Sequence, residues 1–374
     1  MKGKIRFDRN ELAGAFGDIG TDLPLIIGMI LINDLNPAST LIMFGFMQIA
    51  SAFFYGIPMA VQPLKVMAII MLTQKLDKSL LYGAGLSVGI VMFILSASGL
   101  LNKMAQFIAK PVVRGIQCGL GITLASLAMT KYIHTEGIPG YVLSALSFIL
   151  IILLLNNKKY PPALIIIVIG IIYTFVFHFN AKDFEPGLSL ALPHFNKPTL
   201  NAILTGFLLL GLPQIPLSLS NSILATRQTV LDFFPEQKIS ARKIGFTYSF
   251  MNLVNSFFSG VPTCHGAGGI SGHYAFGART GGSLVIYGSL YLVAGLFFSK
   301  TFSNVAHIFP LPLLGILLFF EGIFLMSLLK DTLDSKRNLI TALIVGITCA
   351  TLPYGYLIGI IAGIVVHSIV NRIK

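Results

Sequence analysis

GIPMAVQPLK at residues 56–65 and GVPTCHGAGG at residues 260–269 interrupt an otherwise apolar chain at two matching places. Pro58 and Pro63 break the first stretch, whereas Pro262 and several glycines break the second. Proline lacks the backbone donor that a helix needs, and glycine disfavours helix more than any residue except proline. We therefore expect neither stretch to form a full helix. Each should be extended backbone followed by a half-helix that starts near the middle of a membrane.

The composition predicts an all-α integral membrane protein. Of 374 residues, 55% are hydrophobic and 11% are charged, compared with about 25% charged in soluble domains. Apolar runs recur from Leu25 to Val370, so we expect one membrane domain with the lipid bilayer as its partner. The net charge of +12 comes from short clusters of Lys and Arg between apolar runs, which argues against a nucleic-acid partner.

Apolar runs bounded by Gly, Pro and charged residues predict fourteen membrane segments. The first seven are expected at residues 11–33, 37–55, 58–73, 78–101, 103–130, 139–155 and 160–178. The second seven are expected at residues 199–224, 241–259, 261–277, 281–299, 304–329, 338–352 and 354–371. This division gives a first repeat at 1–180, a connecting loop at 181–198 and a second repeat at 199–374.

The two halves share a weak internal similarity. GIPMAVQPLK is matched with GVPTCHGAGG, and DLPLIIGMIL at 22–31 with QIPLSLSNSIL at 214–224. An odd number of segments per half makes the second copy enter the membrane from the opposite side, as in transporters built from inverted repeats. The alternative is that Gly and Pro simply recur in membrane helices.

The distribution of Lys and Arg predicts the orientation. With fourteen segments and both termini in the cytoplasm, nineteen of the 26 Lys and Arg residues lie inside, six lie outside, and Lys65 lies within a segment. Cytoplasmic loops of membrane proteins carry this excess of positive charge. We therefore expect a multi-pass protein of the cell membrane with both termini cytoplasmic.

The broken third and tenth segments predict an anion site. Paired interrupted segments in inverted halves mark the midplane site of transporters. A dehydrated anion needs compensating positive potential, which two facing helix N-termini provide through about half an elementary charge each and free N–H donors. Lys65 would add a full charge, because ionisable residues inside membranes are functional candidates. Alternatively, Lys65 extends to the membrane interface or pairs with Asp18 or Asp22.

Other polar residues of the segments are candidates with open alternatives. Asp18 and Thr21 are expected to face the protein interior, and Asp18 or Asp22 to neutralise Lys65 or carry a proton, although Asp22 could equally cap a helix. Glu321 is either a proton-coupling carboxylate or a polar anchor facing the bundle. Segment eight offers donors and acceptors that suit an oxyanion or bond between helices, namely Gln214, Ser218, Ser220, Asn221 and Ser222.

No cofactor or metal site is expected. His265 lies in the second broken stretch and could donate to an anion, whereas His273 has no partner at metal-ligand spacing and is expected to pack structurally. Cys118, Cys264 and Cys349 are far apart in apolar stretches and predict neither a disulfide framework nor a paired metal motif. The chain also lacks HExxH and serine-elbow motifs, so we do not expect an enzyme.

Four strings in order resemble the molybdate transporter family, a relative of the sulfate permeases: GAFGDIGTDLP, PMAVQPLKVMAI, GLPQIPLSLSNSILA and VPTCHGAGGISGHYAFGARTGG. The resemblance implies seven plus seven inverted segments, a core domain that moves against a gate domain, and half-helices three and ten that meet at the midplane. It also implies that the C-terminal STAS domain of the sulfate permeases is missing, which fits a chain that ends at residue 374.

The resemblance carries family positions onto this chain. The implied substrate-binding residues are Asp18, Thr21, Gln62, Lys65, Gln214, Asn221, Cys264, His265, Gly266, Ala267, Gly268 and Gly269. Gly17, Gly20, Pro63 and Pro216 also match the family strings. The chain departs from the family where Ala60 stands in place of the usual Pro, where Leu64 stands in place of Met, and where Thr263 precedes the Cys-His pair.

These observations favour a secondary active transporter that carries a tetrahedral oxyanion, molybdate, by alternating access. A sulfate or tungstate transporter of the same fold is the nearest alternative, and an anion channel or a nucleobase carrier is a more distant one. Nucleobase binding would favour carboxylates in segments eight and ten, which have none. Proton coupling and a homodimer are left open.

Overall fold

The computed structural model describes residues 5–101, 103, 109–155, 157, 161–178 and 190–372. In the first half the elements are α1 (Arg9–Ala15), α2 (Ile19–Asn33), α3 (Pro37–Tyr55), β1 (Val61–Pro63), α4 (Lys65–Gln74), α5 (Lys78–Ala97), α7 (Lys110–Leu127), α8 (Gly137–Leu154) and α9 (Pro162–Tyr173). In the second half they are α10 (Leu200–Gly206), α11 (Leu212–Leu217), α12 (Thr226–Phe233), α13 (Ala241–Phe257), β2 (Thr263–His265), α14 (Ala267–Ala275), α15 (Gly282–Phe297), α16 (Ser299–Ile308), α17 (Leu311–Ser327), α18 (Lys336–Thr351) and α19 (Gly355–Arg372).

Part of the predicted organisation lies outside the described residues. This applies to residues 181–189 of the predicted connecting loop and to six of the counted basic residues, namely Lys2, Lys4, Lys158, Lys159, Lys182 and Lys374. Short π-helical segments continue several helices, at Ala128–Tyr132, Thr174–His178, Phe207–Gly211 and Ser218–Ala225, and a 3₁₀ segment lies at Leu328–Thr332.

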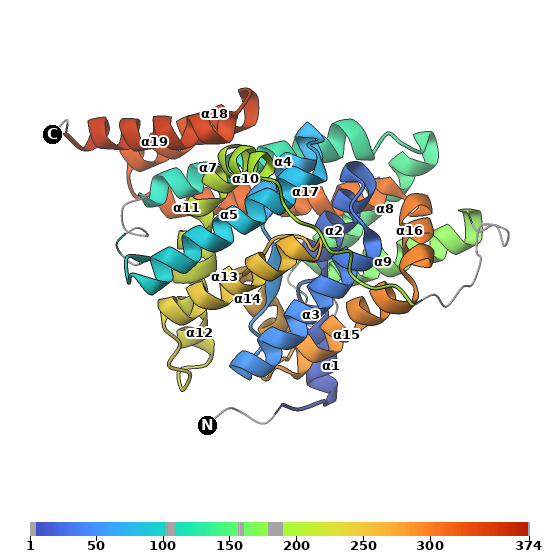
Figure 1. Cartoon of the computed structure of the whole chain (residues 1–374). Coiled ribbons are helices and arrows are strands. Elements are labelled where there is room, and N and C mark those ends of the chain that lie inside the picture. The colour runs from blue at the N-terminus through green and yellow to red at the C-terminus, as the bar shows by residue number, and fades with distance from the viewer. Residues whose placement is uncertain are drawn as a thin grey trace.

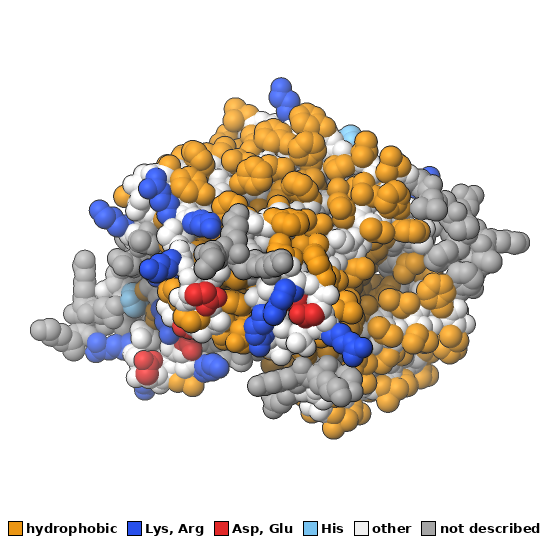
Figure 2. All heavy atoms as spheres, turned by 90° about the horizontal axis from the view of Figure 1, so that it is seen from below, with side chains coloured by type: hydrophobic (Ala, Val, Ile, Leu, Met, Phe, Trp, Pro, Cys, Tyr) orange, Lys and Arg blue, Asp and Glu red, His pale blue; other side chains and the backbone are white. Residues whose placement is uncertain are grey.

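The described helices fit a membrane protein. Six are long and apolar enough to cross a bilayer, or up to eight if the bent pairs α1 with α2 and α15 with α16 each count as one span. α4 falls below this length, as expected of a half-helix, and the division into fourteen segments stays a prediction. Figure 2 shows hydrophobic side chains over most of one face, with most of the basic side chains in the lower left and centre of the view. Such a surface suits lipid rather than water.

The helices pack in two groups. In one group α3 lies along α15, and α5 lies along α13 and α10; in the other α7 lies along α17 and α18, and α18 lies along α19. Figure 1 shows α18 and α19 at one edge of the molecule, and α3 and α15 at another. The first group also includes α2, which contacts α3, and α4, which contacts α2 and the π-helical segment after α10. Fewer contacts join the two groups, chiefly those of α2 with α17 and of α4 with α7. The division is relevant to the site, because its charged residues come from both groups.

Glycines allow helix backbones to touch within each group. A Cβ added at Gly45 of α3 would lie 2.4 Å from the carbonyl oxygen of Gly288 in α15, and one added at Gly121 of α7 would lie 2.5 Å from that of Gly322 in α17. Small residues at such crossings are the usual means of close helix packing in membranes.

Candidate functional site

β1 and β2 form an antiparallel pair in which Val61 lies opposite His265, Gln62 opposite Cys264, and Pro63 opposite Thr263. All six residues are buried. α4 begins at Lys65 and α14 at Ala267, each two residues after its strand ends. Since the strands are antiparallel, the two helices leave from opposite ends of the pair. The expectation that both broken stretches are extended backbone followed by short helices is confirmed.

The two stretches differ in the length of the turn before the strand. The match of Gly56 with Gly260 implies an offset of 204 residues. By contrast, β1 and β2 begin at Val61 and Thr263, and α4 and α14 begin at Lys65 and Ala267, an offset of 202 in both cases. The turn from Gly56 to Val61 is thus two residues longer than the turn from Gly260 to Thr263. By position after its strand, Lys65 stands where Ala267 stands in the second stretch.

Two buried amides clamp the strands, and nothing in the sequence pattern singled them out. Gln48 of α3 donates to the carbonyl of Val61 at 2.7 Å and accepts from the Val61 N–H at 3.2 Å. Asn252 of α13 makes the same pair of bonds with Thr263, at 2.7 and 3.0 Å. An extended strand needs such partners, because unpaired backbone groups are costly in a dry interior.

Lys65 is paired with Glu321 rather than with Asp18 or Asp22. Its ammonium donates to Oε1 of Glu321 at 2.5 Å, and the hydroxyl of Thr21 donates to Oε2 at 3.4 Å. The side chains of Lys65 and Glu321 are each 12% exposed. Because Lys65 lies on α4 and Glu321 on α17, this ion pair joins the two helix groups.

Asp18 lies directly beside β1. The amide nitrogen of Gln62 donates to both carboxylate oxygens of Asp18 at 2.7 Å. The first turn of α14 packs against this pair so closely that a Cβ at Gly266 would lie 1.7 Å from Oε1 of Gln62, and one at Gly269 would lie 2.3 Å from Oδ2 of Asp18. These two glycines are needed for close approach, which explains their place in the motif.

The start of α14 also has an open side. Gly268 is exposed, and a Cβ added there would meet no atom of the described chain within 4 Å. Ala267 is half-buried beside it. The first N–H groups of a helix have no partner within it. Together these features provide donors and space for an anion at the N-terminus of α14.

Asp22 is buried one turn beyond Asp18. The hydroxyl of Tyr287 donates to its Oδ2 at 3.5 Å, and Tyr287 in turn bonds to Tyr291 at 2.9 Å. Within the described residues Oδ1 of Asp22 has no hydrogen-bond partner. Asp22 is therefore not a helix cap, and it has an oxygen available for a proton.

Segment eight meets the site through Gln214. Its Oε1 accepts from the backbone N–H of Val66 at 3.0 Å, in the first turn of α4. Its amide nitrogen donates to Ser218, which bonds to Tyr248 at 2.7 Å. Gln214 thus occupies one of the donors at the start of α4, so it holds that helix whether or not it also contacts an anion.

Asn221 lies elsewhere. It lines a separate pocket of about 280 Å³ with Ser220, Lys110 and Arg114, where α7 faces the π-helical segment Ser218–Ala225. Arg114 and Lys110 both pair with Asp331 in this region, the second at 3.6 Å.

The two histidines are both engaged by the protein. Nδ1 of His265 bonds to the carbonyl of Ala60 at 3.1 Å, and Nε2 bonds to the hydroxyl of Thr247 at 2.9 Å. His273 is buried with Nδ1 2.6 Å from the carbonyl of Gly14, which agrees with its expected structural role. With both ring nitrogens bonded, His265 positions β2 and has no spare donor for an anion in this conformation.

The site therefore gathers most of the predicted residues. Asp18 and Gln62 form one hydrogen-bonded pair, against which Gly266 and Gly269 pack, and Thr21 and Lys65 both bond to Glu321. Cys264 lies opposite Gln62 in the strand pair. One ammonium and a free helix start suit an oxyanion. In the described chain no three His, Cys, Asp or Glu side chains are grouped to hold a metal ion, and the three cysteines are buried thiols.

This fold is that of helical membrane transporters. The chain is similar to the transmembrane domain of the cyanobacterial bicarbonate transporter BicA, with a TM-score of 0.70, 15% identity, and coverage of 97% of this chain and 98% of that one. It is also similar to the murine anion transporter Slc26a9 in its inward-facing state, with a TM-score of 0.70, 13% identity, and coverage of 99% and 69%.

The sequence defines the family. The model described as "Molybdate transporter of MFS superfamily" matches residues 10–124 and 206–325. Molybdate transporters 1 and 2 of Arabidopsis thaliana are 34% and 30% identical, and each alignment covers 94% of this chain and 86% of the relative. The chain belongs to the molybdate transporter family.

Proposed function

We propose that this protein is a secondary active transporter that carries molybdate across the membrane by alternating access. The observation that carries this proposal is the ammonium of Lys65 beside the strand pair from which the open start of α14 emerges, in a chain of the molybdate transporter family. Sulfate and tungstate are tetrahedral dianions of the same kind, so they are the competitors to compare.

The proposed anion site lies between the starts of α4 and α14. Lys65 supplies the full charge, and the first N–H groups of α14, at Ala267, Gly268 and Gly269, supply donors. Thr21, Gln62 and Cys264 border the same space. Gln214, Gly266 and His265 act by holding the helix starts and strands in position. Asn221, in its separate pocket, contacts an anion on its way to or from this site.

Glu321 is the exchangeable counter-ion of Lys65. In the present conformation its carboxylate is paired with the Lys65 ammonium, which the oxyanion needs as its own partner. The anion takes over Lys65 when Glu321 is released, and release is favoured when Glu321 is protonated. Because Glu321 lies on α17, the exchange also breaks a contact between the two helix groups. Anion binding and movement of the groups are thereby linked.

The grouping of carboxyl groups supports proton coupling. Glu321 pairs with Lys65 directly, and the buried carboxyl groups of Asp18 and Asp22 lie near the same ammonium. Like charges this close do not all stay ionised, and an added dianion increases their repulsion. Molybdate therefore binds together with protons, for which Glu321 and the unpartnered oxygen of Asp22 are the acceptors.

The proposed architecture is seven plus seven inverted segments with a core and a gate. The repeats span residues 1–180 and 199–374, so α3 corresponds to α13, and α5 to α15. In support, α3 packs on α15 as α13 packs on α5, and the clamps of Gln48 and Asn252 are equivalent. The core is the group that contains α3, α5, α13 and α15, and the gate is the group that contains α7, α17, α18 and α19.

Uptake of labelled molybdate into proteoliposomes tests the function, with sulfate and tungstate as competitors. We expect uptake that saturates and increases with an inward proton gradient. Lys65→Ala should lower uptake roughly 10- to 100-fold, since a hydrogen bond to a charged group contributes about 1.5–3 kcal/mol. Lys78→Ala, which removes a lysine paired with Asp34 away from the site, is the control. If the parent protein takes up no molybdate with or without a proton gradient, the substrate assignment is wrong. Currents far above carrier turnover would instead indicate a channel.

A further inference from the structure

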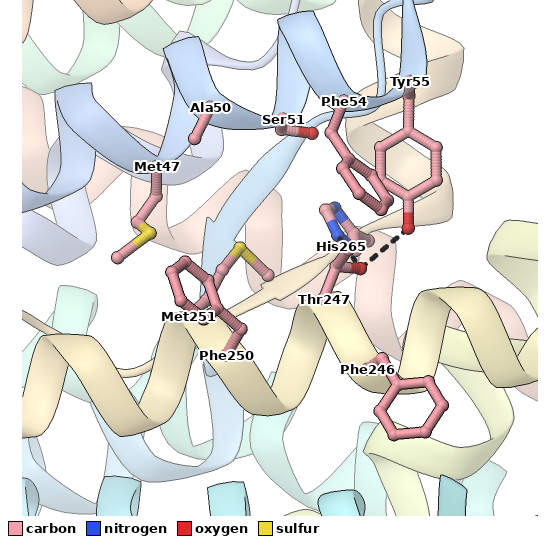
Figure 3. Close-up of a pocket in the computed structure, with 10 residues that line it drawn as sticks. All are labelled: Met47, Ala50, Ser51, Phe54, Tyr55, Phe246, Thr247, Phe250, Met251 and His265. Carbon is pink, nitrogen blue, oxygen red and sulfur yellow. Dashed lines mark hydrogen bonds between the residues drawn. The ribbon is translucent and has the colours of Figure 1, made fainter. Parts of the chain in front are cut away.

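A pocket of about 390 Å³ lies between α3 and α13, behind the strand pair. Figure 3 shows its walls, which consist of side chains from the two helices with His265 of β2 at the inner end. It is lined by Met47, Ala50, Ser51, Phe54, Tyr55, Phe246, Thr247, Phe250, Met251 and His265. Neither the established family nor the proposed anion site accounts for this pocket.

The polar groups of the pocket are already bonded within the protein. Ser51 donates to the carbonyl of Met59 at 2.6 Å. The hydroxyls of Tyr55 and Thr247 lie 2.7 Å apart, and Thr247 also bonds to His265. The remaining lining is aliphatic, aromatic or thioether. The pocket thus suits hydrocarbon and does not suit an oxyanion.

The pocket opens on the surface that faces the surroundings of the protein. Phe54 is 44% exposed and Phe250 is 56% exposed, and both line the pocket. Phe46 and Phe53 of α3 are also exposed, at 47% and 58%. In a membrane protein such a surface is covered by lipid acyl chains.

Two basic side chains lie at one end of the pocket. Both come from the first turn of α13, where Ser240 caps the helix. The ammonium of Lys243 lies 4.7 Å from the ring centre of Phe54 and 4.9 Å from that of Tyr55. The guanidinium of Arg242 lies 5.6 Å from the ring centre of Phe246. Positive charge is therefore held at the mouth of an apolar pocket.

We propose that this pocket binds an anionic glycerophospholipid of the surrounding bilayer. One acyl chain occupies the space between α3 and α13, and the headgroup phosphate contacts Arg242 and Lys243. Basic pockets between membrane helices recognise anionic headgroups in this way. The acyl chain packs against Thr247 and His265, whose hydrogen bond joins α13 to the strand pair. The lipid therefore supports the strand pair, beside which the proposed anion site lies.

The chain contains no tryptophan, which provides a direct test of binding. Phe54→Trp places a single fluorophore in the pocket wall. In bilayers that contain a small fraction of brominated phosphatidylglycerol or brominated phosphatidylcholine, we expect the anionic lipid to quench this fluorophore at a concentration roughly three- to tenfold lower. Phe46→Trp is the matched control, because Phe46 is similarly exposed on the same helix but does not line the pocket. It should be quenched equally by both lipids.

Charge variants complete the test. In the Phe54→Trp protein, Arg242→Gln with Lys243→Gln should abolish the preference for phosphatidylglycerol, whereas Lys238→Gln, an exposed position before α13, should preserve it. An unchanged elution volume on size-exclusion chromatography establishes that each variant is folded. Equal quenching by both lipids in Phe54→Trp, or the same preference in Phe46→Trp, would overturn the proposal. Because the readout needs no transport, its failure is distinct from failure of molybdate uptake.

Discussion

Lys65 and Glu321 reach each other from α4 and α17, so a change in either residue acts on the site and on the contact between the helix groups. Glu321→Gln keeps the size of the side chain but removes its negative charge. We expect uptake by this variant to lose most of its increase at acidic pH, because the group that takes up the proton is gone. Uptake measured across a pH series, relative to the parent protein, checks this prediction.

Two outcomes contradict the assignment of Glu321. If the pH profile of Glu321→Gln matches that of the parent protein, the proton acceptor is Asp22 or Asp18 instead. Loss of uptake at every pH, with normal folding, would mean that Glu321 is needed as an anion itself. Asp22→Asn provides the comparison, since its unpartnered oxygen is the other proposed acceptor.

Gly268 and Gly269 are neighbours with opposite surroundings, so they form a matched pair. A methyl group at Gly268 meets open space, whereas one at Gly269 lies 2.3 Å from Asp18. Gly268→Ala should fold normally and raise KM for molybdate severalfold, because the methyl group enters the space proposed for the anion. Gly269→Ala should lower the unfolding temperature. An unchanged KM in Gly268→Ala would place the anion elsewhere.

At the residue scale, the sequence predicted which residues lie close together better than it predicted the contacts between them. Lys65 and Asp18 stand out because charge is rare inside membrane segments. The pairing of Lys65 with Glu321 was not predictable, because 256 residues separate them and several carboxyl groups were available. The bonds of His265 to Ala60 and Thr247 were not predictable either, since they form only when the two strands pair.

At the scale of elements, the clamps of Gln48 and Asn252 hold β1 and β2 in position. Gln48→Leu and Asn252→Leu each leave a buried N–H and a buried carbonyl without partners, at a cost of about 1–3 kcal/mol per group. Each variant should therefore unfold at a lower temperature in detergent, and the two effects should be similar if the halves are equivalent. Gln228→Leu is the control, because its exposed side chain bonds only to Asp232. Unchanged stability in both variants would contradict the clamp.

The broken elements were the most predictable ones. Proline and glycine limit the backbone locally, so the short helices after residues 63 and 265 could be inferred without tertiary contacts. The two-residue difference in turn length between the two stretches was not predictable, because short turns vary in length while strand register does not.

At the scale of the whole molecule, the charge bias predicts which face is cytoplasmic. The three native cysteines are buried, so single cysteines introduced at the surface can be read separately. With an impermeant maleimide, Lys300→Cys should react in intact cells and Lys238→Cys only in inside-out vesicles. The reverse pattern would invert the orientation, and reaction of both from one side would contradict an odd number of segments between them.

Lys65 and Ala267 begin the two short helices that the proposed inverted repeats make equivalent, but only one of these residues carries a charge. The backbone around the proposed site would therefore be two-fold symmetric, whereas its positive charge would lie on one side only. When inverted halves exchange shapes, this backbone presents the same geometry to either face, whereas the ammonium remains with the first half. On its way to one compartment the anion passes the Lys65 ammonium, and on its way to the other it moves away from that ammonium. We expect the half-saturating molybdate concentrations at the two faces to differ, so that a single lysine makes the kinetics of transport asymmetric while the gradients set the direction of net flux.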